Sequence, residues 1–490
     1  MKSAVLVVVT FAAWLGSALC EATEKYDTIV VGMGAAGVTA ASTLAKAGRR
    51  VLGLEADDRV GGRVHTVAFE DGVIEIGAEW IHGTVNNSVY DAAVQNNVST
   101  EEQSLTNEVF RSDGSYGDRD LFNELIEFCE ETAKESGDAP EPLGQFVTAR
   151  LMEYLEENHP DVLKDQEFLT EFLEVMNLNI DNDKASNDWN DITTHTTYEV
   201  LEGHYHTSWH KHGYKTFFEI LLNEYNNGSG LPSLDIKLNK EVTQIKWPKD
   251  STGDVEVVCK DGKTFTADNV IVTVSLGVLK ERYSELFSPS LPQEKIEAIQ
   301  TISIGIVDKI ILKFDQAWWT SIPYTYKYFL WKGEDKQQVS DEDYWTTRIF
   351  ACSSSLGSQN TLTLWTSGEV GKLVETLPEN VVLEKSVALL RQFIGNFTIP
   401  DPIGMIRSTW YSNPFTRGSY SYDNLVMPQY PDARSVLRQP LLDAAGTPRV
   451  LFAGEATDLT HFSTVHGASD SGHREAMSLL PASKIQPARP

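Results

Sequence analysis

Three glycines near the N-terminus have the spacing of a dinucleotide-binding turn. Gly32, Gly34 and Gly37 follow a short apolar run and open a stretch of small residues that favours a helix. In such a turn the first glycine permits a tight bend, the second lets the backbone approach a pyrophosphate, and the third allows helix and strand to pack closely. Glu55, about 20 residues further on, can hold ribose hydroxyls, and an acid there disfavours a 2′-phosphate. This pattern predicts a bound dinucleotide.

A charged residue interrupts an apolar segment later in the chain. Lys309 stands in SIGIVDKIILKF, which has the composition of a buried strand. A buried ammonium group costs desolvation free energy unless it has a specific use or its long stem carries the charge to water. Lys309 is therefore a candidate functional residue, with a surface-directed lysine as the alternative.

Five histidines gather in one segment, where the His-x-His spacing occurs twice. Such spacing can hold a metal, but no cysteine or closely spaced carboxylate accompanies it, so we expect no bound metal. The five are His195, His204, His206, His210 and His212.

The elements that carry these residues follow from hydrophobic patterning. Tyr26–Val31 and Arg50–Leu54 are predicted strands on either side of a helix over Ala35–Ala47, and together they form a β-α-β unit. The later elements are helices between about Ser115 and Val175, an irregular polar segment at Asp181–His212, strands at Asp235–Trp247, Val255–Thr264, Asn269–Val274, Ser303–Phe314 and Val450–Phe452, and a last helix starting near His466.

Length and charge restrict the classes of partner. The chain has 490 residues, 41% of them hydrophobic, and a formal net charge of −29 at pH 7. This length exceeds one typical domain of about 100 to 200 residues, so we expect two interleaved domains in one compact molecule. The acidic excess makes nucleic acid a poor partner. It would attract a polycationic substrate, although solubility alone explains the charge equally well.

The first residues have the organisation of a secretory signal peptide. Lys2 and an apolar stretch from Ala4 to Leu15 precede Cys20, and the stretch is shorter than the roughly 20 residues that span a bilayer. We expect cleavage near Cys20 and secretion, with a membrane anchor as the alternative and no later spanning segment. Sequons at Asn86, Asn97, Asn227 and Asn396 suit this route. The cysteines that remain, Cys129, Cys259 and Cys352, allow at most one intramolecular disulfide.

Further motifs indicate which dinucleotide is bound. DRVGGR at Asp58–Arg63 adds a second glycine pair and an arginine. Near the C-terminus, FAGEAT at Phe452–Thr457 and TVHGA at Thr464–Ala468 precede Ser471-Gly472. In this order, and over essentially the whole mature chain, the motifs resemble those of the flavin-containing amine oxidase family. The resemblance implies FAD as the cofactor.

The resemblance also implies the fold class and the division of the chain. We expect an α/β fold in which a Rossmann-like FAD-binding domain is interleaved with an α+β substrate-binding domain, a mixed sheet flanked by helices. The predicted division is residues 1–20 for the signal peptide, 21–85, 230–295 and 445–485 for the FAD-binding domain, and 86–229 and 296–444 for the substrate-binding domain.

Cofactor contacts carry over from the family motifs position by position. Arg63 would meet the pyrophosphate, the backbone of Val242 the adenine, and Glu455 the ribityl chain or pyrophosphate. Ser419 stands where monoamine oxidases have the cysteine that attaches their flavin, so we expect non-covalent FAD. The full predicted set is Gly32, Gly34, Ala36, Gly37, Glu55, Arg63, Gly77, Ala78, Glu79, Trp80, Val242, Gly454, Glu455, Thr464 and Val465.

The segment GAEWIHG at Gly77–Gly83 is similar to polyamine oxidases, and its histidine to the animal spermine and acetylpolyamine oxidase form. The resemblance implies catalytic roles for His82, which would face the substrate, and Lys309, which would hold a water against flavin N5. Thr464 replaces an aromatic wall of monoamine oxidases, and this disfavours aromatic amines. The predicted substrate-binding residues are Trp80, His82, Tyr420, Thr464 and, for a distal ammonium, Glu199 and Glu202.

The implied reaction is oxidation of a polyamine (spermine, spermidine or an acetylated form) at a carbon next to a secondary amine. The imine hydrolyses to an aldehyde and an amine, while O2 is reduced to H2O2. Two alternatives stay open. A secreted L-amino-acid oxidase would need an arginine to clamp the substrate carboxylate, for which Arg407 and Arg417 are candidates. A non-catalytic flavin-binding interaction protein would keep the fold without the chemistry.

Overall fold

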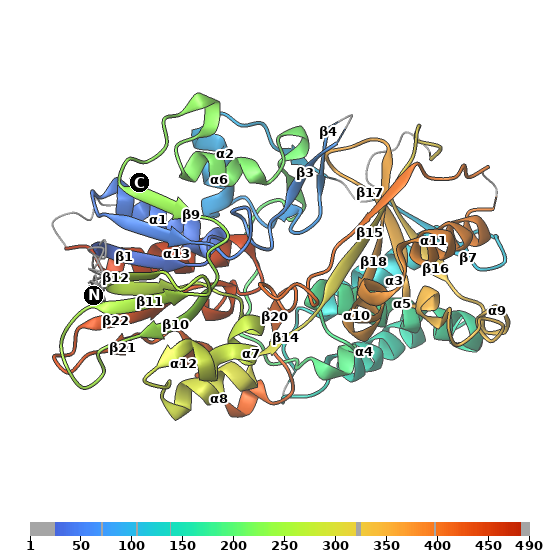
Figure 1. Cartoon of the computed structure of the whole chain (residues 1–490). Helices are drawn as coiled ribbons and strands as arrows, with labels where there is room; N and C mark the ends of the chain where they lie inside the picture. The colour runs from blue at the N-terminus through green and yellow to red at the C-terminus, as the bar shows by residue number, and fades with distance from the viewer. Residues whose placement is uncertain are drawn as a thin grey trace, which may run out of the picture.

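The computed structural model describes residues 25–69, 72–103, 106–137, 139–319, 325–395 and 398–481. The predicted signal peptide at residues 1–20 lies outside this part of the chain. In Figure 1 the chain forms two halves, one around a nine-stranded sheet and one around a six-stranded sheet. This mixed architecture of sheets and helices confirms the predicted fold class.

The nine-stranded sheet has a parallel centre that contains the predicted β-α-β unit. β1 (Lys25–Val31) pairs in parallel with β2 (Val51–Leu54) and with β12 (Thr264–Val272), and its apolar run is buried as in other parallel sheets. α1 (Ala35–Lys46) packs against α13 (Val465–Ser478). A Cβ at Gly472 of α13 would lie 2.0 Å from a carbonyl oxygen of α1, so the two helices approach this closely only because glycine stands there.

The segment predicted as one strand over Asp235–Trp247 forms two strands on opposite sides of this sheet. β9 (Leu234–Lys237) pairs with β2, whereas β10 (Val242–Lys246) pairs with β11 (Val255–Cys259) and β13 (Phe287–Ser288). Between them the chain turns at Asn239, whose φ is 55°. The prediction was wrong because apolar residues alternate up to this turn and resume after it, so the pattern contained no clear break.

The second half is a sheet with helices on both faces. The strands lie in the order β19-β15-β18-β17-β16-β7. They are β7 (Thr106–Arg111), β15 (Val307–Lys313), β16 (Thr325–Leu330), β17 (Ala351–Ser354), β18 (Thr361–Ser367) and β19 (Gly404–Arg407). The helices are α3 (Arg119–Thr132), α4 (Leu143–Asn158), α5 (Gln166–Lys184), α10 (Gly368–Thr376) and α11 (Glu379–Phe393). Tyr328 and Leu330 pack toward α3–α5, whereas Phe329 between them packs toward α11. This period-2 alternation gives the sheet two separate cores.

Short strand pairs lie between the two halves (Figure 1). β3 (Thr66–Phe69) pairs with β4 (Gly72–Glu75), and β14 (Ser303–Ile304) pairs with β20 (Ser421–Tyr422). The predicted domain boundaries stay a prediction. The remaining elements are β5 (Trp80–Ile81), β6 (Glu101–Glu102), β8 (Thr207–Ser208), β21 (Leu441–Leu442), β22 (Pro448–Phe452), α2 (Ser88–Gln95), α6 (Lys215–Leu221), α7 (Leu276–Leu286), α8 (Gln293–Thr301), α9 (Gly333–Lys336) and α12 (Ala433–Arg438).

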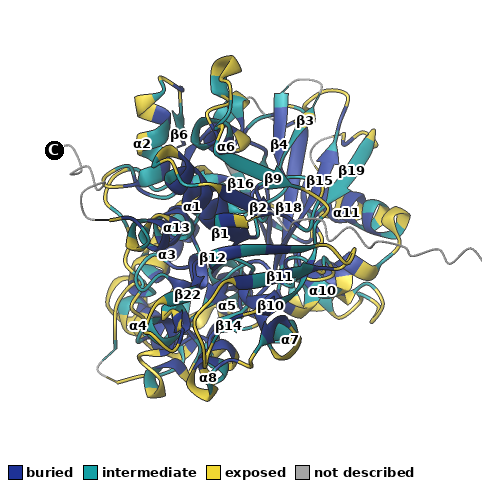
Figure 2. Ribbon diagram, turned by 60° about the vertical axis from the view of Figure 1, so that its left-hand side comes forward, coloured by how far each residue is buried: buried dark blue, intermediate teal, exposed yellow. Residues whose placement is uncertain are grey.

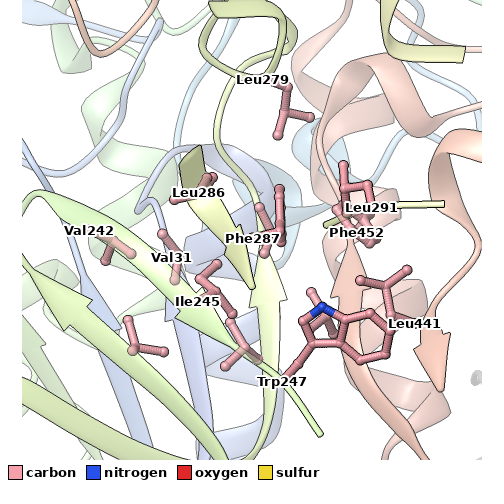
Figure 3. Packing of buried hydrophobic residues seen from close by; sticks show 14 of the residues in the cluster. Val31, Val242, Ile245, Trp247, Leu279, Leu286, Phe287, Leu291, Leu441 and Phe452 are labelled. Carbon is pink, nitrogen blue, oxygen red and sulfur yellow. The ribbon is translucent and has the colours of Figure 1, made fainter. Parts of the chain in front are cut away.

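The strands of both sheets are mostly buried, and the exposed residues gather on outer helices and loops (Figure 2). Figure 3 shows one part of the core, where Ile245 and Trp247 lie near Phe287 and Phe452. Burying one such side chain contributes about 1.5–3 kcal/mol. This packing holds β10 in place, and with it Val242 at the start of the strand.

The cysteines do not cross-link the fold. Cys129, Cys259 and Cys352 are all buried and free, so the one disulfide that the sequence permits is not formed among the described residues. Within the same residues, every helix is too short or too polar to cross a bilayer.

Candidate functional site

A cavity of about 850 Å³ lies between the two halves of the molecule. One end is lined by the first turn of α1 and the ends of β1 and β2. The other end is lined by residues of α3 and α5 and by aromatic side chains of the six-stranded sheet. Both sheets contribute residues to this one space, so a cofactor and a substrate can meet in it.

The glycine-rich turn lines the first end of the cavity. Gly32 has a φ of +94°, and a Cβ at Gly37 would lie 1.9 Å from the carbonyl oxygen of Gly32, so both positions need glycine. Gly34 precedes α1 and offers it no capping side chain. The first backbone N–H groups of α1, which carry a partial positive charge, can therefore donate hydrogen bonds to a bound anion. This arrangement fits a pyrophosphate.

Glu55 is buried at the end of β2 and lines the same end of the cavity. Its carboxylate accepts hydrogen bonds from the amides of Met33, at 2.7 Å, and Asp57, at 2.9 Å. Burial raises the pKa of Glu55, and these two hydrogen bonds oppose the shift. The bond to Met33 fixes the carboxylate beside the glycine turn, as the predicted contact with a ribose requires.

Arg63 and Glu455 form an ion pair on the cavity wall. Nη1 of Arg63 donates to Oε1 of Glu455 at 3.0 Å and to the carbonyl oxygen of Ser419 at 2.6 Å. Burial alone would raise the pKa of Glu455, but Arg63, the Ser421 hydroxyl and Arg434 together hold it below its usual range. The acid is therefore a fixed anion that orients the arginine.

All the predicted cofactor-binding residues except Gly37 line the cavity. Gly37 lies inside the turn against Gly32, which agrees with the packing role of a third glycine. The individual contacts to FAD stay a prediction.

Lys309 is buried on β15 and faces the cavity. Its ammonium donates to the carbonyl oxygens of Glu75 and Gly77, both at 2.9 Å, and to Oε2 of Glu79 at 2.7 Å. Nζ also lies 4.8 Å from the centre of the Trp365 ring. The surface-directed alternative for Lys309 is therefore wrong, because its charge is held inside the molecule.

His82 lies on the cavity wall with its ring tilted against Tyr205, at 4.4 Å between centroids. Its Nδ1 lies 3.1 Å from the Tyr205 carbonyl oxygen. A carbonyl only accepts hydrogen bonds, so Nδ1 carries the hydrogen and Nε2 keeps a lone pair. Burial lowers the pKa of His82, and the ring is therefore neutral at neutral pH.

An acid close to His82 was not predicted from the sequence. Asp183 lies near the end of α5, lines the cavity, and pairs with Lys184 at 2.9 Å. Burial alone would raise its pKa, but Lys184, His82 and His206 hold it below its usual range. The same part of the cavity is lined by the tyrosines Tyr198, Tyr205, Tyr326, Tyr328 and Tyr420.

The predicted helix stopped near Val175, and this is why Asp183 was overlooked. The apolar positions continue at Leu178 and Ile180, both buried, and α5 runs to Lys184. Following the helical period for two more turns would have placed Asp183 on a helix instead of in the irregular segment.

The predicted distal acids lie outside the cavity. Glu199 and Glu202 are exposed, and neither is among the residues that line it. Their backbones are held instead, because the amide of Glu199 donates to Thr460 and the carbonyl of Glu202 accepts from Thr84. Their neighbours Val200 and Gly203 line the cavity, whereas Glu199 and Glu202 themselves are exposed and do not. The geometry therefore does not support their assignment to a substrate ammonium, which stays a prediction.

Three other predicted residues line the cavity and have fixed partners. The Tyr420 hydroxyl donates to the carbonyl oxygen of Asn182 at 2.7 Å. The Ser419 hydroxyl donates to the carbonyl of Val307 at 2.9 Å and accepts from its amide at 2.8 Å. Thr464 caps α13 through its hydroxyl. These side chains form a preorganised wall, with Tyr420 and Thr464 in the predicted cage region.

Neither candidate carboxylate clamp reaches the cavity. Arg407 donates to the carbonyl oxygens of Val374 and Leu377, behind β19. Arg417 pairs with Glu281 at 2.7 Å in a separate cleft of about 520 Å³. The geometry thus gives no support to an amino-acid oxidase that uses either arginine.

The histidines of the polar segment have separate partners. His195 lies 2.8 Å from the carbonyl oxygen of Gly137, and His210 lies 3.0 Å from Glu101. His206 packs edge-on against Trp80 in the cavity, and burial lowers its pKa to about 4. Across the described ranges, no three His, Cys, Asp or Glu side chains are grouped as metal ligands.

Comparison with known proteins extends this description. The family model of flavin containing amine oxidoreductases matches residues 35–480. The peroxisomal N(1)-acetyl-spermine/spermidine oxidase of Homo sapiens is 31% identical, over 96% of this chain and 98% of its own length. The Bos taurus protein of the same name is 30% identical, over 92% and 94%. Polyamine oxidase 1 of Oryza sativa subsp. japonica is 29% identical, over 93% and 97%.

The fold also has solved counterparts. The structure of a putrescine oxidase double mutant, redesigned in cofactor binding, matches with a TM-score of 0.65 at 18% identity. The match covers 93% of this chain and 99% of the other. At this identity the likeness concerns the fold alone.

Proposed function

The chain belongs to the flavin-containing amine oxidoreductase family, and we propose that it is an FAD-dependent oxidase of polyamines. The observation that carries the proposal is a single cavity with two different ends. One end fits a dinucleotide through the glycine turn and Glu55, and the other presents the Asp183 carboxylate among tyrosine rings. Carboxylates and aromatic rings are the groups that bind alkylammonium ions.

The residues that would hold FAD are the first turn of α1, Glu55, and the pair of Arg63 with Glu455. When bound, FAD accepts a hydride equivalent from the carbon next to the amine nitrogen and passes the electrons to O2, which becomes H2O2.

The chain's own side chains orient the amine. Nδ1 of His82 is held by the Tyr205 carbonyl, so Nε2 of the neutral ring is free to accept a hydrogen bond from the reacting nitrogen or to take up its proton. Asp183 binds a second ammonium group of the same substrate. Two fixed contacts along one flexible polyamine select which carbon faces the cofactor. The rings of Trp80 and Tyr420 exclude water around it.

The names of the relatives support this substrate class, since they describe oxidases of acetylated polyamines and of polyamines. The net charge of −29 would also steer a polycation toward the protein. Because Asp183 is paired with Lys184, its site is less negative than an isolated carboxylate. Substrates with fewer charges than spermine, including acetylated polyamines, are therefore candidates as well.

A peroxide assay tests the proposal directly. Purified holoenzyme would be mixed with spermine, spermidine, N1-acetylspermine, putrescine and several L-amino acids. Peroxide release with at least one of the three larger polyamines supports the proposal. Activity restricted to L-amino acids would replace it with the amino-acid oxidase alternative, and FAD-loaded protein inactive on every compound would favour a non-catalytic role.

We also propose that the protein enters the secretory route. The support is the signal-like composition of residues 1–20 and the exposure of Asn86, Asn97 and Asn227; Asn396 lies outside the described residues. Expression in animal cells, followed by an assay of the medium and a glycosidase digest, checks this. Protein retained in the cells without a glycosidase-sensitive mass would refute it.

A further inference from the structure

Glu79 and Lys309 form a buried ion pair on the cavity wall. Their side chains are 7% and 5% exposed, and Nζ lies 2.7 Å from Oε2. Glu79 comes from the segment between β4 and β5, whereas Lys309 comes from β15 of the six-stranded sheet. The pair therefore joins the segment between β4 and β5 to the six-stranded sheet at the cavity.

Lys309 donates hydrogen bonds to three acceptors of the protein, two from the main chain and one from a side chain. Two ammonium hydrogens go to main-chain carbonyl oxygens, those of Glu75 and Gly77. The third goes to the Glu79 side chain. Two donors held by main-chain carbonyls also fix the direction of the third, because the three N–H bonds of an ammonium group keep tetrahedral angles. The Glu79 carboxylate is the acceptor in that direction, and it is the only one of the three acceptors that a side-chain substitution can remove.

Charge compensation at this place also depends on Glu79. A buried ammonium without a partner costs several kcal/mol, and pairing offsets that cost. A second buried acid that interacts electrostatically with Lys309 is Glu75. Burial raises its pKa to about 7, and its carboxylate is bound to the Tyr214 amide and the Thr66 hydroxyl. At neutral pH Glu75 is therefore only partly ionised, and most of the compensation comes from Glu79.

We propose that Glu79 is a positioning residue that orients Lys309 and cancels its charge on the wall of the FAD cavity. The pair, not the lysine alone, then sets the electrostatic potential that bound FAD experiences. The inference rests on the proposed function in one respect, that FAD occupies this cavity.

The reduction potential of bound FAD tests the pair without any amine substrate. Reduction adds negative charge to the flavin, so an uncompensated ammonium favours it. Glu79→Gln keeps a hydrogen-bond acceptor and removes the charge, and it should raise the potential by about 30 mV or more at neutral pH. For a two-electron couple this equals a tenfold change in the ratio of reduced to oxidised flavin. The potential would be read against a reference dye.

The double variant identifies the source of the shift. In Glu79→Gln/Lys309→Met both charges are gone, and the potential should return close to the wild-type value. Glu171→Gln is the matched control, because Glu171 is a buried acid paired with Arg111 and does not line the cavity; it should leave the potential unchanged. No shift in Glu79→Gln, or an equal shift in the double variant, overturns the proposal.

Loss of FAD from Glu79→Gln would still be informative. An uncompensated lysine is then the expected cause, and the double variant should bind FAD again. If it does not, the proposal is refuted. The potential measurements use no amine substrate, so their outcome does not depend on whether the protein oxidises polyamines. The peroxide assay tests that activity separately.

Discussion

The backbone of Tyr205 fixes the tautomer of His82. Nδ1 of the imidazole donates to the Tyr205 carbonyl oxygen across 3.1 Å, and the lone pair of Nε2 is left as an acceptor. Burial lowers the pKa of His82 and keeps the ring neutral. An acceptor of this kind suits the N–H of an amine and does not suit a carboxylate.

Replacing His82 by Ala should leave FAD bound and lower kcat/KM for polyamines at least about tenfold, or about 1.4 kcal/mol of transition-state stabilisation. Steady-state peroxide assays and the visible spectrum measure the two effects. His204→Ala is the control, since the His204 carbonyl accepts the amide of Gly83, next to His82, and His204 does not line the cavity. Equal kinetics for the two variants would show that His82 serves the fold only.

Asp183 should contribute to binding more than to chemistry. Asp183→Asn removes the cavity carboxylate, so the KM for spermine should rise at least about tenfold while kcat changes less, because the ammonium contact is remote from the reacting carbon. Glu199→Gln removes one equal charge from the exposed surface and should change neither. A matching rise in KM for both variants would indicate long-range steering instead of a contact.

Local patterns made part of this site predictable from the sequence. Gly32, Gly34, Gly37 and Glu55 were found because the turn and the two strands form one short continuous unit. Lys309 was found because a charge in an apolar strand needs a reason. In each case the physical requirement acts within a few residues, so the signal survives without tertiary information.

The substrate end of the cavity had no such signal. Asp183, Tyr205 and Tyr326 come from three separate segments and meet only when both sheets are in place. Their roles depend on the direction of each side chain, as Glu199 shows: it lies in the right segment and faces solvent. β16, β17 and β18 were also not predicted, and β16 and β18 carry part of this wall. Convergence of distant segments is set by packing, which periodicity does not describe.

Denaturing the protein should release FAD in chemically intact form. The Ser419 hydroxyl is bound to the backbone of Val307 and has no thiol chemistry to form a thioether. Acid or heat denaturation followed by filtration should recover FAD in the filtrate, as its absorbance and mass show. Flavin that stays with the polypeptide would contradict non-covalent binding.

Lys309→Met should keep the packing of β15 and slow the flavin half-reactions. Methionine preserves stem length while it removes the donor, and either reduction by amine or reoxidation by O2 should slow at least about tenfold, about 1.4 kcal/mol of barrier. Rapid mixing measures each half-reaction separately. Lys327→Met is a matched control, because Lys327 is a buried lysine of the same sheet, paired with Glu108, that does not line the cavity. Unchanged rates in a fully FAD-loaded Lys309→Met variant would remove the catalytic role.

A buried acid on β15 should make stability depend on pH. Asp308 is 1% exposed, accepts the Ser408 hydroxyl at 2.6 Å, and lies near Glu375, which accepts the amides of Tyr411 and Ser412. Burial and then the charge of Glu375 raise the pKa of Asp308 to about 8. Between the unfolded pKa, about 3.9, and this value, the folded chain holds a proton that the unfolded chain has lost.

The free energy of unfolding should therefore fall as pH rises through this window. Replacing Asp308 by a residue that does not titrate should make this fall smaller. Asp308→Asn keeps the acceptor for Ser408 but has no acid to ionise. The free energy of unfolding of this variant should therefore decrease less between about pH 5 and 8 than that of the wild type. One proton that is bound only in the folded state changes this free energy by about 1.4 kcal/mol per pH unit. Glu75 and Asp181, whose pKa values burial raises to about 7, keep part of the slope in both proteins. Denaturant titrations across this pH range measure the difference, and parallel curves for the two proteins would mean that Asp308 is already ionised in the folded state.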